Sequence, residues 1–213
     1  MLTRAELKSK AKEQIKGKIG ILFLCNLVVF GILILLFTPF SLSSYNESFL
    51  FIGIIPYFAG LFSAPAFEIS IIMIYLALSH GIRPKVADVF KGFNLFGKAL
   101  WLNILMGVFV LLWSMLLIVP GIIKGLSYSM APYILAENPT MKAREALNES
   151  KLIMKGQKMR LFVLYLSFIL WSLLGMVTCC IAYIYVGPYI QATITNFYHD
   201  IKQKPEAELT EAA

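Results

Sequence analysis

The sequence predicts an all-α integral membrane protein: a six-helix bundle with short amphipathic helices lying in the cytoplasmic interface. Three observations support this prediction. Apolar residues make up 59% of the chain and charged residues 15%, whereas soluble domains hold about a half and about a quarter. The apolar residues lie in stretches long enough to cross a hydrocarbon layer of roughly 30 Å. The basic residues lie in blocks between those stretches, as they do in cytoplasmic loops.

The first 18 residues are predicted to form a basic amphipathic helix on the cytoplasmic membrane surface. They carry six Lys or Arg side chains, and Thr3 with Glu6 has the spacing of a capping box. A charged, solvated leader is the alternative. The apolar residues expected on one face of this helix are Leu2, Ala5, Leu7, Ala11 and Ile15.

Six later stretches are predicted to span the membrane, within one membrane-embedded domain of residues 1–201. They are residues 19–37, 61–79, 99–119, 122–137, 161–177 and 180–197. The fourth is short, but the blocks on either side of the hairpin 99–137 are both basic, so an even number of crossings must separate them. Residues 49–60 are expected to be irregular or interfacial, and residues 202–213 to be a solvated tail without regular structure.

Prolines are predicted to end or interrupt these spans, because proline cannot donate the next backbone hydrogen bond. Pro39 is expected to close the first span and Pro188 to interrupt the sixth. Pro120 and Gly121 are expected to reverse the chain between the third and fourth spans. A short interfacial helix is also predicted before the third span, on the spacing of Val86, Val89, Phe90, Phe93 and Phe96.

The charge distribution predicts a cytoplasmic location for both termini. All but one of the 19 Lys and Arg residues lie in residues 1–18, 81–98, 140–160 and 201–213. The exception, Lys124, is expected to reach the outer interface with its flexible side chain. The net charge of +7 is therefore interpreted as a match to anionic membrane lipids, and nucleic acid is not expected as a partner.

A threefold repeat of one helix followed by two spans is a further hypothesis. Its predicted hinges are Gly17-Lys18, Gly97-Lys98 and Gly156-Gln157-Lys158. The alternative is chance, because Pro and Gly gather at span ends in any multi-pass protein.

Four segments carry a resemblance to a known family. They read LKSKAKEQIKGK, ADVFKGF, LLIVPGIIKGLSYSMAPYILAENPTMKAREALNESKLIMKG and GPYIQATITNFYHDI. With these motifs the chain resembles an uncharacterised bacterial membrane-protein family related to YciC and to the membrane domain that accompanies some glycerophosphodiester phosphodiesterases. The resemblance implies a six-helix protein of the bacterial cytoplasmic membrane. It implies no catalytic residue and no cofactor.

Glu68 is the most informative single side chain, because it lies 12 residues before His80, inside a predicted span. A carboxylate at that depth must be paired, protonated or facing water. One interpretation is a proton- or ion-coupled site. The other is an interhelical hydrogen bond to Asn26, Asn103 or Tyr128.

Metal and cysteine chemistry have little support in the sequence. His80, Glu137 and His199 could bind a metal if the fold brought them together, but their spacing is typical of interfacial span ends. No cofactor is predicted. The cysteines lack CxxC spacing and are interpreted as packing residues, with a vicinal redox pair as the alternative for the last two: Cys25, Cys179 and Cys180.

The function predicted from these observations is that of a non-enzymatic membrane protein that interacts with lipids or with a membrane-protein partner. The alternative is a small carrier with Glu68 in an intramembrane polar path. A weaker alternative is an intramembrane enzyme that acts on lipids. A water-accessible cavity that reaches Glu68 would favour the carrier.

Overall fold

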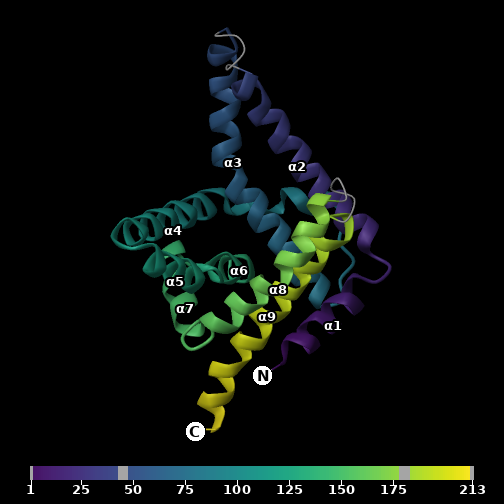
Figure 1. Cartoon of the computed structure of the whole chain (residues 1–213), viewed down its shortest axis with the longest axis vertical. Coiled ribbons are helices and arrows are strands. Elements are labelled where there is room, and N and C mark those ends of the chain that lie inside the picture. The colour runs from purple at the N-terminus through teal and green to yellow at the C-terminus, as the bar shows by residue number, and fades with distance from the viewer. Residues whose placement is uncertain (1, 43–47, 178–182, 212–213) are drawn as a thin grey trace.

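The computed structural model describes residues 2–42, 48–177 and 183–211, and these residues form helices without a strand. The long helices pair into three hairpins, α2 with α3, α4 with α5, and α8 with α9 (Figure 1). Their bounds are α2 (Ile19–Ser41), α3 (Ser48–Ser79), α4 (Phe96–Leu116), α5 (Ile118–Tyr128), α8 (Lys158–Val177) and α9 (Tyr183–Glu211).

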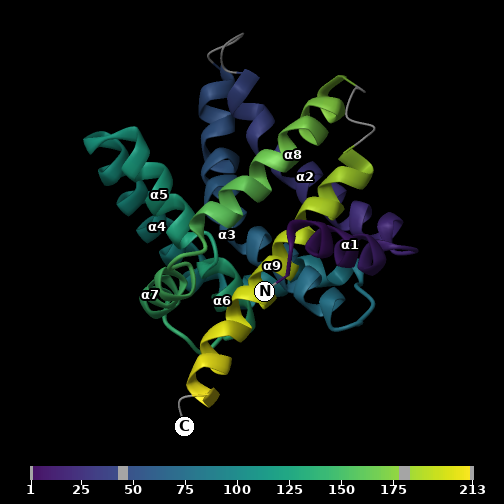
Figure 2. The same ribbon diagram turned by 60° about the horizontal axis from the view of Figure 1, so that its bottom comes forward.

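Four shorter elements and the C-terminal half of α9 form the base of the molecule, from which the hairpins project (Figure 2). These elements are α1 (Arg4–Ile15), the 3-10 helix η2 (Val86–Leu95), α6 (Ala131–Glu137) and α7 (Ala143–Ile153). The order of short helix and hairpin follows the predicted repeat, and the repeat itself stays a prediction.

Within the described part of the chain, three helical segments are long and apolar enough to cross a membrane: Ile19–Ser41, Ile52–Ser79 and Val86–Leu116. Large apolar side chains are exposed along them, for example Phe30 at 63% and Met115 at 78%. A soluble monomer rarely exposes apolar surface on this scale, and hydrocarbon is the medium in which it is stable. These helices therefore indicate a membrane protein, and the full set of six crossings stays a prediction.

The apolar face of α1 packs against protein, whereas the prediction had this face in contact with the membrane; a position of α1 at the cytoplasmic surface stays a prediction. Leu7, Ala11 and Ile15 are buried in the core of the base, largely against α9. The predicted capping box is present: Thr3 accepts from the Glu6 backbone N–H at 3.3 Å, and Glu6 accepts from Thr3 N–H at 2.6 Å. Burial by protein thus leaves the basic side chains of α1 on the outside.

The helix α3 is continuous from Ser48, where an irregular segment was predicted for residues 49–60. Pro56 and Pro65 lie inside it, and Pro39 lies inside α2 without ending it. In hydrocarbon a helix cannot replace its backbone hydrogen bonds with bonds to water. An unbroken helix is therefore favoured, although each proline removes one of its hydrogen bonds. Pro188 likewise lies within α9.

The chain reverses at Leu117, three residues before the predicted turn at Pro120 and Gly121. Leu117 is extended, with φ −162° and ψ 142°, and α5 begins at the next residue. In a continuous helix the Pro120 ring would clash with the carbonyl of Leu116, which is the last residue of α4. Gly121 serves close packing instead, because a Cβ there would lie 2.9 Å from the Cβ of Ser114.

The predicted fourth span, residues 122–137, is divided between α5 and α6. The break falls where Pro132 enters the first turn of α6, a position in which its missing N–H costs nothing. The residues of α6 from Ala131 to Ala136 are buried in protein. The apolar composition of α6 therefore reflects the protein core, whereas Ile122 and Ile123 of α5 are 50% and 43% exposed.

The predicted interfacial helix is the 3-10 helix η2. Three residues per turn place Phe90, Phe93 and Phe96 in one row, with ring centroids 6.3 and 6.4 Å apart. All three are exposed, while Val89 and Gly92 face α3. Exposed phenylalanines on one face of a short amphipathic helix are typical of helices that lie in the membrane interface.

Two of the three predicted hinges have the backbone of a hinge. Gly17 and Gly156 adopt φ +74° and +77°, which favours glycine. Gly97 lies inside α4, and the third glycine with positive φ among the described residues is Gly81, after α3. At the other end of the chain, α9 continues to Glu211, where a tail without regular structure was predicted.

Candidate functional site

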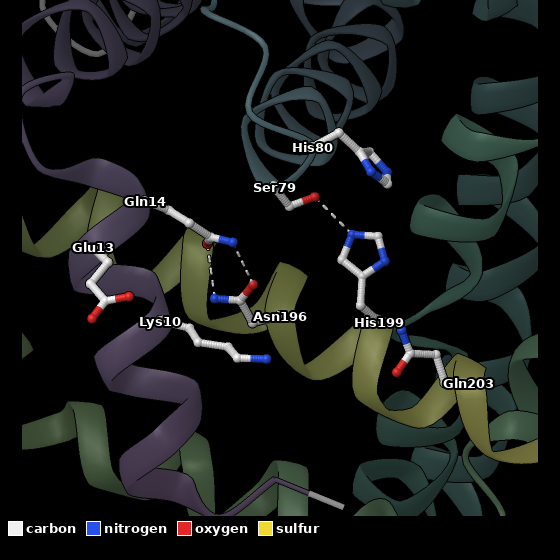
Figure 3. Close-up of a pocket in the computed structure, with 8 residues that line it drawn as sticks. All are labelled: Lys10, Glu13, Gln14, Ser79, His80, Asn196, His199 and Gln203. Atoms are coloured by element: carbon white, nitrogen blue, oxygen red, sulfur yellow. Dashed lines mark hydrogen bonds between the residues drawn. The ribbon is translucent and has the colours of Figure 1, made fainter.

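A polar pocket of about 410 Å³ opens in the base, between α1, the end of α3 and α9 (Figure 3). Three chain segments that are far apart in the sequence supply its walls, and all eight lining side chains are polar or charged. The lining residues are Lys10, Glu13, Gln14, Ser79, His80, Asn196, His199 and Gln203.

A reciprocal amide pair fixes α1 against α9 at one wall of the pocket. Gln14 Nε2 donates to Asn196 Oδ1 at 3.0 Å, and Asn196 Nδ2 donates to Gln14 Oε1 at 2.9 Å. Asn196 is buried, so an unpaired amide there would be costly. The pair carries no charge, and it therefore holds the wall in place independently of pH.

His199 occupies the centre of the pocket and is oriented by α3. Its Nε2 lies 2.8 Å from Ser79 Oγ, and the Ser79 hydroxyl donates to the Leu76 carbonyl at 2.7 Å. When the single hydroxyl proton points to the Leu76 carbonyl, Ser79 Oγ can accept a hydrogen bond from the Nε2–H tautomer of His199. The ring of His80 lies 5.4 Å from that of His199.

The pKa of His199 lies below its ordinary value, chiefly because burial disfavours the charged imidazolium. The carboxylate of Glu137, on α6, acts in the opposite direction, and it is outweighed. His80 and Lys202 lower the pKa of His199 further through their charges. The folded protein therefore holds this histidine neutral at a pH at which an exposed histidine is partly protonated.

A pH-dependent stability follows, since the unfolded chain binds a proton that folded His199 rejects. We expect the free energy of unfolding to fall as the pH decreases from 7.5 through about 6.5 to 5.5, because protons then favour the unfolded state. Thermal unfolding in detergent at pH 7.5 and 5.5 measures this loss. In His199→Gln the loss should be smaller, and an unchanged pH dependence in that variant would contradict the assignment.

Glu137 lies beside the pocket in a separate network. Its Oε2 accepts from Lys202 Nζ at 2.7 Å and also from the Tyr198 hydroxyl. Burial raises the pKa of Glu137, but the Lys202 and Tyr198 hydrogen bonds outweigh it and hold the pKa below its ordinary value.

Of the three residues considered as metal ligands, the structure brings His80 and His199 together, while Glu137 bonds to Lys202 and Tyr198. Among the described residues no group of three His, Cys, Asp or Glu could hold a metal ion.

A second polar junction secures the start of the chain. Arg160 donates to Asp200 Oδ2 and to the Leu2 carbonyl, both at 2.8 Å. The other carboxylate oxygen of Asp200 accepts from the Leu2 backbone N–H at 2.9 Å. The junction joins α8, α9 and the chain entering α1, and it therefore supports the wall that carries Lys10.

The predicted intramembrane site is only partly assembled. Asn103 Nδ2 donates to Glu68 Oε2 at 3.1 Å, linking α4 to α3. The other two residues bond elsewhere: Asn26 donates to the Leu22 carbonyl and to the Tyr75 hydroxyl. Tyr128 is buried beneath Lys151, whose ammonium lies 5.4 Å from the ring. Glu68 does not line the polar pocket of the base.

The remaining predicted residues lie apart from the pocket. Lys124 lies over the ring of Trp113 at 4.6 Å, near the α4–α5 turn. Cys25 is buried in the core, and the vicinal Cys179 and Cys180 lie outside the described residues.

Sequence reasoning missed three residues of the polar pocket: Lys10, Gln14 and Asn196. The one available signal was the polar Asn196 inside an apolar run.

A family model with the description "Protein of unknown function (DUF975)" matches residues 1–124 and 115–205. The chain belongs to this family. The two matches together cover almost the whole sequence, so the leader, the hairpins and the pocket all fall within the family's extent. No curated protein and no solved structure matches the chain. The DUF975 description assigns no function.

Proposed function

We propose that this DUF975 protein is a non-enzymatic protein of the bacterial cytoplasmic membrane that binds the phosphate-bearing head group of anionic lipids. In this proposal the base faces the cytoplasm and both termini lie there. The relationship to YciC and to the phosphodiesterase-associated membrane domain belongs to the same proposal and rests on the sequence motifs.

The observation that carries the proposal is the depth of the polar pocket. Ser79, which lines it, is also the last residue of the candidate membrane span Ile52–Ser79. A helix of 28 residues is about 42 Å long, more than the roughly 30 Å of hydrocarbon, so a span that crosses the layer carries its last turn, and the pocket beside it, to the level of lipid head groups. A lipid with its acyl chains beside the hairpins would present its phosphate at this depth.

The side chains of the pocket suit a phosphate. The Lys10 ammonium extends into the pocket toward Asn196 and His199 (Figure 3). A lysine binds phosphate as a point charge, and histidines beside it can donate further hydrogen bonds. Glu13, the one acidic residue of the lining, reduces the net positive charge that Lys10 gives the pocket.

A non-enzymatic role is favoured by the state of the one Ser–His pair in the pocket. A nucleophilic serine needs its proton taken by the histidine. Here the Ser79 hydroxyl has a second acceptor, the Leu76 carbonyl at 2.7 Å, which competes with His199 Nε2 for its single proton. The contact orients the imidazole, and the competing carbonyl disfavours activation of the hydroxyl.

The test is lipid binding by the purified full chain in a neutral detergent. Native mass spectrometry should show retention of phosphatidylglycerol in preference to phosphatidylcholine. In Lys10→Gln the affinity for phosphatidylglycerol should fall about tenfold, the scale of one charged hydrogen bond. The matched control is Lys16→Gln, an exposed lysine of the same block outside the pocket, which should bind as the wild type does.

Glycerol phosphate distinguishes a lipid site from a site for a free phosphate. Calorimetric binding of glycerol phosphate as tight as that of the lipid would indicate a soluble ligand. Equal loss of phosphatidylglycerol in Lys10→Gln and in Lys16→Gln would reduce the effect to general surface charge and contradict the proposed site.

A further inference from the structure

A second, apolar groove lies between the first and third hairpins, on the hydrocarbon-facing part of the molecule. Its volume is about 600 Å³, and its lining is apolar apart from Asn26 and the hydroxyl of Tyr183. The helix α2 supplies one wall from Phe23 to Leu33, and α9 supplies the other with Tyr183, Gly187 and Pro188.

We infer that this groove binds one acyl chain of a membrane phospholipid. The site is separate from the polar pocket, and the inference does not rest on the proposed head-group function. Three properties of the groove support it: its length, its surroundings and its dryness.

The length of the groove matches one leaflet of a bilayer. From Phe23 to Leu33 the helix α2 rises about 15 Å at 1.5 Å per residue, which is half of a roughly 30 Å hydrocarbon layer. Phe23 lies in the second turn of α2, which begins at Ile19 beside the base. The groove therefore occupies the leaflet next to the base, and a chain bound in it would lie along the span.

The groove opens to the hydrocarbon around the protein, so lipid acyl chains are the molecules that can enter it. Little of α2 is covered by protein, and the side chains that flank the groove are open to the outside, with Leu27 47% exposed. At this depth the medium is hydrocarbon, so an acyl chain can enter sideways without crossing a polar layer. An acyl chain in the groove makes van der Waals contacts with both walls, and these contacts are absent when the groove is empty.

The amide nitrogen of Asn26 does not require water inside the groove. The amide nitrogen of Asn26 donates inward, to the Leu22 carbonyl at 2.8 Å and to the Tyr75 hydroxyl at 3.3 Å. An apolar space without polar demand stays dry and accepts apolar ligands. The Asn26 hydrogen bonds thus close the inner side of the groove while leaving its walls apolar.

Gly187 is a suitable position for a substitution that fills the groove. A Cβ at this position would meet nothing within 4 Å, so a larger side chain can be added without a clash and will occupy the groove. Gly107, on α4, is equally open and lies outside the groove. Gly187→Leu and Gly107→Leu therefore form a matched pair: each adds the same side chain to an open helical position.

The probe is a phosphatidylcholine whose acyl chain carries a photoactivatable diazirine, reconstituted with the full chain in phosphatidylcholine vesicles. Mass spectrometry of the labelled peptides should show α2 between Phe23 and Leu33 labelled more strongly than the exposed face of α4. Gly187→Leu should reduce the α2 labelling about fivefold, which corresponds to loss of a modest binding free energy. Gly107→Leu should leave it unchanged.

Equal labelling of α2 and α4, unaffected by Gly187→Leu, would overturn the inference and leave only unspecific lipid contact. If Gly187→Leu fails to fold, Leu27→Trp fills the same groove from the α2 wall and decides the question. The head-group proposal is tested by phosphatidylglycerol retention and the acyl-chain inference by photolabelling of α2, so a failure of one is distinguished from a failure of the other.

Discussion

Replacement of Gly92 by alanine should destabilise the protein strongly, although it adds only one methyl group. A Cβ at this position would overlap the backbone carbonyl of Ala66 and lie 2.5 Å from Ser70 Oγ and 2.8 Å from the Ser70 backbone nitrogen. Two of these three atoms are backbone, so η2 as a whole must move away from α3. We expect a loss of about 3 kcal/mol or more in the free energy of unfolding, the upper part of the range for overpacking.

The same displacement also breaks hydrogen bonds. The Gly92 N–H donates to Ser70 Oγ at 2.8 Å, and the Ser70 hydroxyl donates to the Ala66 carbonyl at 2.9 Å. All three groups are buried, so the bonds lost are not replaced by water. The defect should therefore affect the packing of η2 and the row of phenylalanines that it presents.

Thermal or denaturant unfolding of the detergent-solubilised protein measures the effect of Gly92→Ala. Gly97→Ala is the control, because Gly97 lies in α4 with nothing within 4 Å of a Cβ. That variant should be neutral or stabilised by up to about 1 kcal/mol, since alanine suits a helix better. Similar stabilities for the two variants would show that the close approach of η2 to α3 is not maintained in the folded protein.

Composition predicted the membrane class, but it could not separate lipid-facing residues from core residues. The apolar residues of α2, such as Phe30, are exposed as the hydropathy of the segment suggests. Leu7 and Ile134 are equally apolar, and both are buried by protein in the base. Hydropathy measures transfer out of water, and a protein core and a bilayer both provide that transfer. For this reason the sequence did not show that the apolar face of α1 and the apolar run of α6 are buried by protein.

Local patterns were predicted better than long-range contacts. The Thr3–Glu6 cap depends on three residues of spacing and is present as expected. The polar pocket depends on residues 10, 80 and 196 meeting in space, and no spacing rule connects them. His80 and His199 were recognisable as polar ends of apolar segments, whereas Lys10 was one of six similar cations in the leader.

Prolines illustrate a related limit. Pro120 lies close to a chain reversal, but the reversal itself is at Leu117. The N–H of Leu117 donates the last hydrogen bond of α4, to the carbonyl of Trp113. Pro39 and Pro56 leave their helices unbroken. The steric rule for proline holds in each case, but its consequence depends on the neighbouring backbone and on the medium around the helix.

Replacement of Asp200 by asparagine should release the N-terminal helix from the base. The carboxylate accepts two hydrogen bonds, from Leu2 N–H and from Arg160, and its side chain is only 7% exposed. An asparagine amide has one acceptor and one donor end, so in either orientation its NH₂ group faces another donor. The Arg160 guanidinium, 29% exposed, would also lose its ion-pair partner.

We expect Asp200→Asn to lower the free energy of unfolding by roughly 2 to 3 kcal/mol, the scale of charged hydrogen bonds. Limited digestion with trypsin should then cut the lysines of α1 faster than in the wild type, because a helix that leaves α9 exposes its backbone. Asp88→Asn is the matched control: its partner Lys91 is 63% exposed, and such surface pairs contribute well under about 1 kcal/mol. Equal cleavage of α1 in wild type and Asp200→Asn would mean that the apolar face of α1 holds it in place without this junction.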